Sequence, residues 1–125
     1  MEKIKANCLN PVVLAFVGDA VYSLFVRERL TFMSDGKAGE LNKLAVKEVK
    51  ASAQAEFITE LLPLLTEEET AVFKRARNAK KTTRAKNASV AEYNLSTGFE
   101  AVLGYLYLTG NEERLDFILN KGIIQ

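Results

Sequence analysis

A long apolar run near the N-terminus limits how this chain can fold. Residues 14–30 read LAFVGDAVYSLFVRERL, and their large apolar side chains recur at helical spacing. Asp19 is the only charge before the last few residues of the run, and Gly18 precedes it. Both residues weaken a helix, and a carboxylate among apolar side chains is costly unless a cation or hydrogen-bond donors satisfy it. This run alone leaves two interpretations of Asp19: a metal-binding or catalytic carboxylate, or an acid that meets solvent or caps a neighbouring helix.

A second apolar run, near the C-terminal end, has the same design. Residues 96–108 read STGFEAVLGYLYL, in which Glu100 is the lone charge and Gly104 follows four residues later. Glycines let two helix backbones approach closely, so pairing of the runs would bring Asp19 and Glu100 to one divalent cation. In the alternative interpretation, each acid is satisfied separately, by water or by one of the hydroxyls of Tyr22, Thr97 and Tyr105.

The missing residue types exclude several kinds of active site. The 125 residues, 48% of them apolar, suit one globular domain, which we expect to span residues 1–125. There is no histidine and only one cysteine, which excludes Ser-His and Cys-His nucleophiles and intrachain zinc sites built from those residues. Catalysis would have to rest on carboxylates, lysines, hydroxyls or a hard metal ion, and carboxylates suit Mg²⁺ or Mn²⁺.

The same sequence predicts a cytoplasmic protein that does not enter a membrane. No apolar run reaches the roughly 18–20 residues that a membrane span needs. The N-terminal residues lack the apolar core of a signal peptide, and Cys8 cannot form an intramolecular disulfide.

Positive charge is concentrated in one segment, residues 74–86. It holds seven of the 17 basic residues and none of the 16 acidic ones, so ten basic residues face 16 acidic ones in the rest of the chain. Such a segment is either a solvated surface loop or a contact for a polyanion, and its density favours nucleic acid. The predicted RNA-binding residues are Lys74, Arg75, Arg77, Lys80, Lys81, Arg84 and Lys86.

Helix signals recur along the whole chain, and no convincing strand pattern appears. We therefore predict an all-α fold of about six helices. The expected helices run from Pro11 to about Leu30, from Lys37 or Gly39 to about Val49, from Ser52 to near Pro63, from Thr66 into the basic segment, from Asn87 or Ser89 to Gly110 with a possible break at 94–96, and from Glu112 to Asn120. Residues 1–9 are expected to be a short lead-in.

Both apolar runs resemble motifs of the ribonuclease III family. FVGDAVYSLFVRERL is similar to the family signature around Asp19, and STGFEAVLGYLYL is similar to its partner motif around Glu100. The short chain, Tyr22 and the KRARNAK segment resemble the Mini-III branch in particular. The resemblance implies an all-helical nuclease domain without a double-stranded-RNA-binding domain, a homodimer, and dependence on Mg²⁺, with Mn²⁺ as a substitute. It also implies cleavage of double-stranded RNA, and Mini-III enzymes mature 23S large-subunit ribosomal RNA.

The match to the family pattern is partial. Larger members carry a glutamate one turn before the signature aspartate, where this chain has Ala15, and an aspartate three residues before the glutamate, where it has Thr97. Both losses fit the Mini-III pattern. They leave Asp19 and Glu100 as the predicted catalytic and metal-binding residues.

The sequence thus predicts a magnesium-dependent endoribonuclease, and the resemblance implies that its products carry 5′-phosphate and 3′-hydroxyl ends. The alternatives are a non-catalytic RNA-binding or assembly module on the same fold and a helical protein-interaction domain. The aromatic residues of the two runs exceed what a small monomer can bury, which predicts a homodimer. These residues are Phe16, Tyr22, Phe25, Tyr105 and Tyr107.

Overall fold

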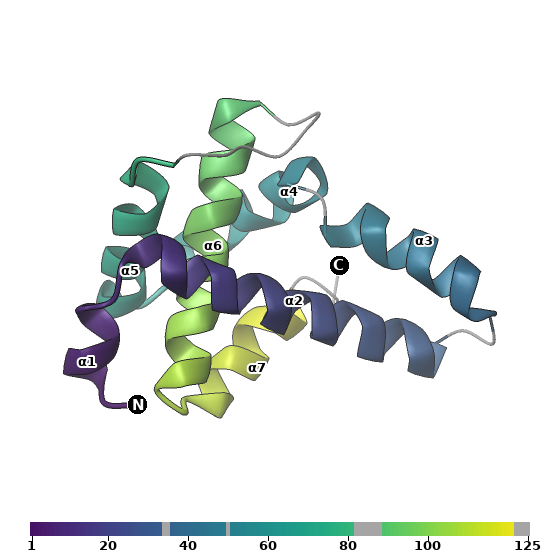
Figure 1. The fold of residues 1–125 in the computed structure, drawn as a ribbon, viewed down its shortest axis with the longest axis horizontal. Coiled ribbons are helices and arrows are strands. Elements are labelled where there is room, and N and C mark those ends of the chain that lie inside the picture. The colour runs from purple at the N-terminus through teal and green to yellow at the C-terminus, as the bar shows by residue number, and fades with distance from the viewer. Residues whose placement is uncertain (34–35, 50, 82–88, 122–125) are drawn as a thin grey trace.

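The computed structural model describes residues 1–33, 36–49, 51–81 and 89–121, and these residues fold as helices around one central helix (Figure 1). The elements are α1 (Lys3–Asn7), α2 (Pro11–Met33), α3 (Ala38–Val49), α4 (Ala51–Leu61), the 3₁₀ turn η1 (Leu62–Leu64), α5 (Glu67–Asn78), α6 (Val90–Leu108) and α7 (Glu112–Lys121). No strand occurs within these ranges, so the all-α prediction is confirmed.

Helix α6 is the centre of the fold. Helices α2, α4 and α5 all pack against it, and α2 makes the largest of these interfaces (Figure 1). Except for Glu100, which is half-buried, every residue of α6 from Ser96 to Leu106 is buried. The sequence predicted one apolar stripe on this helix. Between Ser96 and Leu106, residues on all sides of the helix are buried instead, because neighbouring helices cover it from several sides.

Helices α5 and α6 pack against each other, and side-chain caps set where each of them begins. Thr66 and Glu69 form a reciprocal capping box before α5, and Ser89 and Glu92 form the same arrangement before α6. Each box satisfies backbone N–H groups that have no partner within the helix. The predicted start of α5 after Thr66 is confirmed, and Gly110, with φ of 75°, follows the end of α6 as expected.

Several predicted boundaries were wrong. Helix α2 continues to Met33 instead of ending near Leu30, and α6 is unbroken through residues 94–96. The N-terminal lead-in contains helix α1, which is held by contacts from α5 and α6 that no local pattern signals. The predicted turn at 31–36 lies partly outside the described residues.

Candidate active site

The site lies where α2 crosses α6, and two glycines set how closely the helices approach. A Cβ on Gly18 would lie 1.6 Å from the carbonyl oxygen of Glu100. A Cβ on Gly104 would lie 2.0 Å from the carbonyl oxygen of Leu14. No side chain fits at either position, so the backbones touch here only because both residues are glycine.

This crossing brings the two predicted carboxylates together. Asp19 follows Gly18 on α2, and Glu100 stands one turn before Gly104 on α6. The carboxyl groups of Asp19 and Glu100 are joined by a hydrogen bond, and we call these two residues the acid pair. The pKa of Glu100 is raised to about 9, mainly by burial and further by the hydrogen bond to Asp19 and the negative charge of Asp19, against a smaller opposing effect of a hydrogen bond from Ser96. This raised pKa keeps the Glu100 carboxyl group protonated at neutral pH.

Two of the three hydroxyls proposed as alternative partners donate elsewhere. Thr97 donates to the carbonyl oxygen of Tyr93 at 2.9 Å, and the Tyr105 hydroxyl donates to Glu68. The Tyr22 ring packs edge-on against Phe99, with 5.4 Å between ring centroids. A hydroxyl that was not proposed reaches Glu100: the Oγ of Ser96 donates to Glu100 Oε1 at 3.5 Å. The sequence offered one signal for it, since Ser96 precedes Glu100 by four residues and so lies on the same face of the helix.

The acid pair fits a hard divalent cation. Two adjacent carboxyl groups supply oxygen ligands, and a divalent cation would relieve the repulsion between their charges. Within the described ranges, no group of three or more histidine, cysteine, aspartate or glutamate side chains gathers to hold a metal ion. Water and substrate oxygens would therefore complete the coordination, as Mg²⁺ sites commonly allow.

Comparison with known proteins agrees with this geometry. The family model described as the ribonuclease III domain matches residues 12–111, which include both carboxylates. A Mini-ribonuclease 3 of Clostridium tetani is 49% identical over 112 residues, covering 89% of this chain and 74% of that protein. A Mini-ribonuclease 3 of Streptococcus pneumoniae is 46% identical over 119 residues, covering 94% of this chain and 93% of that protein.

The chain belongs to the Mini-III branch of the ribonuclease III family. The X-ray crystal structure of a Fusobacterium nucleatum protein has the same fold, with a TM-score of 0.84, 32% sequence identity and 93% of each chain covered. Membership confirms the predicted family, and with it the prediction that the chain is an endoribonuclease. None of the described helices combines the length and apolar character that crossing a bilayer requires.

An apolar groove of about 800 Å³ lies beside the acid pair of Asp19 and Glu100. Its walls come from α2, α7 and the C-terminal end of α6, and Asp19 stands among its lining residues. Among the aromatic residues predicted at an interface, Phe16, Phe25 and Tyr107 line the groove, and Phe16 and Tyr107 are 79% and 58% exposed. Phe25 and Tyr22 are half-buried, and the prediction was wrong for Tyr105, which is 1% exposed and packs in the core.

Some basic residues of this Mini-III chain's segment face solvent, and some make contacts that hold the fold. Lys74, Arg75 and Lys80 are exposed. Arg75 is tied to α1 through Asn7, and Lys81 donates to the carbonyl oxygens of Arg77 and Ala79 at 3.0 and 2.8 Å.

Three residues of the basic segment remain: one has contacts that limit its side chain, and two lie outside the described residues. Arg77 donates to Asn78 Oδ1 at 3.1 Å, and its guanidinium lies over the Phe73 ring. Arg84 and Lys86 fall outside the described residues.

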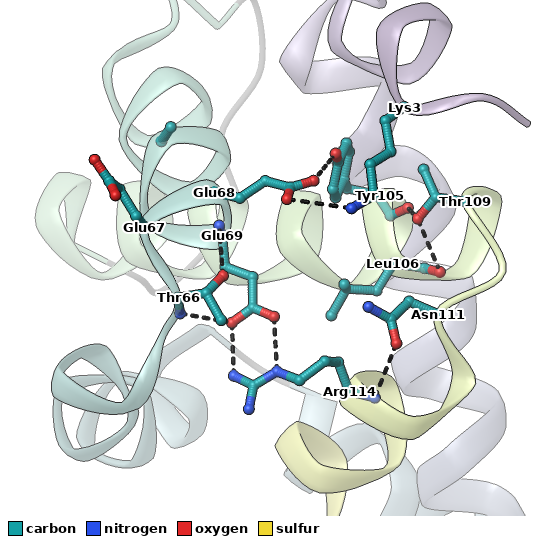
Figure 2. A pocket seen from close by; sticks show the side chains of 11 residues that line it. Lys3, Thr66, Glu67, Glu68, Glu69, Tyr105, Leu106, Thr109, Asn111 and Arg114 are labelled. Atoms are coloured by element: carbon teal, nitrogen blue, oxygen red, sulfur yellow. Dashed lines mark hydrogen bonds and ion pairs between the residues drawn. The ribbon is translucent and has the colours of Figure 1, made fainter.

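A second pocket, of about 590 Å³, is lined by three glutamates, of which Glu68 and Glu69 have side-chain partners (Figure 2). Figure 2 shows Glu69 held between Thr66 and Arg114, with Glu68 turned toward Tyr105 and Lys3. Neither Asp19 nor Glu100 lines this pocket. These contacts join α5 to α1, α6 and α7, so the pocket belongs to the packing of the domain and not to the acid pair.

Proposed function

We propose that this chain is a magnesium-dependent endoribonuclease that cleaves double-stranded RNA, and that residues 1–125 form its catalytic domain. Mn²⁺ would substitute for Mg²⁺ because it takes similar oxygen ligands. The observation that carries the proposal is the pairing of Asp19 and Glu100 at a helix crossing that only glycines allow.

Asp19 and Glu100 would hold the cation. When bound, the cation supplies Lewis-acid activation of water and neutralisation of phosphate charge. Glu100 loses its proton to become a ligand, and Asp19, which is exposed, provides the solvent-facing carboxylate. Gly18 and Gly104 fix the separation of the two helices that carry these acids. The sequence has no histidine, so no imidazole can act as general base. Hydrolysis to 5′-phosphate and 3′-hydroxyl ends would therefore depend on the cation that these carboxylates hold.

The substrate would be bound through the exposed part of the basic segment. Lys74 and Lys80 are free to meet phosphates, and Arg84 and Lys86 continue the same charged stretch of sequence. A-form RNA is recognised by its shape, phosphates and 2′-hydroxyls more than by its sequence. In line with the Mini-III resemblance, we propose the precursor of 23S large-subunit ribosomal RNA as the natural substrate, met in the cytoplasm.

A homodimer would cover the groove beside the acid pair. Phe16 and Leu24 are large apolar side chains, 79% and 66% exposed, on the same wall of that groove. In a two-fold dimer the same surface is used by both copies, so the Phe16 of each copy would enter the groove of the other. Such an assembly places two acid pairs beside each other, one for each strand of a duplex.

The test is cleavage of a long RNA duplex with and without Mg²⁺. The wild-type chain should cut only with the metal, and Asp19→Asn should abolish cutting while the protein remains folded and binds the duplex. Glu60→Gln, which removes an exposed carboxylate on α4, is the matched control and should cut normally. Normal cleavage by Asp19→Asn would overturn the proposal. Duplex binding without any metal-dependent cleavage would instead identify a non-catalytic RNA-binding module.

A further inference from the structure

Ser96 is a buried polar residue whose hydroxyl meets the acid pair. Its side chain lies on α6, is only 5% exposed, and donates to Glu100 Oε1 at 3.5 Å. The two residues are four apart on one helix, so their side chains lie one above the other. At this length the bond is weak, but it connects directly to one oxygen of a residue that belongs to the active site.

Threonine hydroxyls on the helices of this protein show the more usual bond, which runs to the backbone. A serine or threonine inside a helix commonly donates to the backbone carbonyl four residues earlier. Four threonines do so here, at 2.7–3.0 Å: Thr31 to Arg27, Thr59 to Ala55, Thr97 to Tyr93 and Thr109 to Tyr105. The bond from Ser96 runs forward along the helix, to a side chain.

We propose that Ser96 is a positioning residue that holds the Glu100 carboxyl group in place for a divalent cation. The proposal rests on the proposed function, in which Asp19 and Glu100 share that cation. A glutamate side chain has three rotatable bonds, and a hydrogen bond to one oxygen limits their rotation. Hydrogen-bond partners of metal ligands orient those ligands and strengthen metal binding in this way.

The experiment measures binding of Mn²⁺ alone to the full chain, by electron paramagnetic resonance, without RNA. Ser96→Ala removes only the hydroxyl oxygen and should weaken Mn²⁺ binding about tenfold, the lower end of the effect seen for such partners. The Mg²⁺ concentration that gives half-maximal cleavage should rise by a similar factor. Ser96→Thr keeps the hydroxyl and should restore binding to within about twofold of wild type.

Thr97→Val is the matched control. Thr97 is as buried as Ser96 and adjacent to it, but its hydroxyl bonds to the backbone of Tyr93. This variant should bind Mn²⁺ as wild type does. Unchanged Mn²⁺ affinity in Ser96→Ala, or an equal loss in Thr97→Val, would overturn the positioning role while leaving the proposed function intact. If Asp19→Asn binds Mn²⁺ as tightly as wild type, the acid pair holds no cation, and both proposals are wrong.

Discussion

Arg75 binds Asn7 twice, through Nη1 to the backbone carbonyl oxygen at 3.0 Å and through Nη2 to Oδ1 at 3.1 Å. These bonds fasten α1 to α5 across 68 residues of sequence. Asn7 also donates to the Tyr105 hydroxyl at 3.4 Å, which links the same point to α6. One of the seven basic residues predicted to bind RNA is therefore part of the contact that holds the N-terminal helix in place.

Substitutions of Arg75 and of the lysines Lys74 and Lys80 should have different effects, the first on stability and the second on RNA binding. Replacing Lys74 and Lys80 with alanine should weaken duplex binding and lower the slope of log K against log salt by about one to two units, because each phosphate contact contributes about 0.9. The melting temperature should hardly change. Arg75→Ala should instead lower stability by about 1–2 kcal/mol, through loss of hydrogen bonds from a charged group. The measurements are duplex affinity at several salt concentrations and thermal melting. A salt slope that the double variant leaves unchanged would remove these lysines from the RNA-binding surface.

The glycine crossing should be intolerant of even one methyl group. Gly104→Ala would place a Cβ 2.0 Å from the Leu14 carbonyl oxygen, so α2 and α6 must separate or the fold must fail. We expect a loss of at least about 3 kcal/mol in the free energy of unfolding, measured with urea, and loss of cleavage. Gly39→Ala on α3 is the control, because no atom lies within 4 Å of its added Cβ. That variant should be unchanged or up to about 1 kcal/mol more stable. Wild-type stability in Gly104→Ala would show that the helices do not meet as described.

The Glu69–Arg114 ion pair should make stability depend on pH. Glu69 is 3% exposed and its burial alone would raise its pKa, but hydrogen bonds from Arg114 and Thr66 and the Arg114 charge lower the pKa below 4.5 overall. A lowered pKa stabilises the folded state above the unfolded-state pKa of about 4.5, and this stabilisation is lost as pH falls through the folded-state value.

Glu69→Gln should therefore cost about 2 kcal/mol at pH 7 and progressively less as the pH falls below about 4.5. Urea unfolding of both proteins between pH 3 and 7 measures this difference. Glu67→Gln, at an exposed position on the same helix turn, should change stability by less than about 1 kcal/mol. A Glu69→Gln penalty that stays constant over this pH range would contradict the assigned pKa shift.

Exposed aromatic residues should differ in their effect on assembly. Phe16→Glu would place a charge in the apolar groove and should convert a dimer into a 13.9 kDa monomer in sedimentation at micromolar concentration. Phe32→Glu is the control, since Phe32 is 82% exposed but is not among the residues that line the groove. It should sediment as wild type does. A wild-type chain that is monomeric at these concentrations, or a dimeric Phe16→Glu variant, would rule out this interface.

Local pattern in the sequence predicted much of the helical framework. Capping residues such as Thr66 act on the backbone within a few residues, so the start of α5 can be read from the sequence. The possible break in α6 was wrong, because packing of α2, α4 and α5 stabilises this helix along its length and overrides the weak helix preference of residues 94–96.

The sequence by itself determined which residues could form the acid pair, since Asp19 and Glu100 each stand alone among apolar residues beside a glycine. Only the tertiary structure decided what surrounds that pair and which charges are free. The hydroxyl that reaches Glu100 belongs to Ser96 and not to Thr97, Tyr105 lies in the core, and Arg75 is engaged by α1. The physical reason is that a residue's local sequence limits its helix and its face, whereas its partners come from segments that packing brings together from far along the chain.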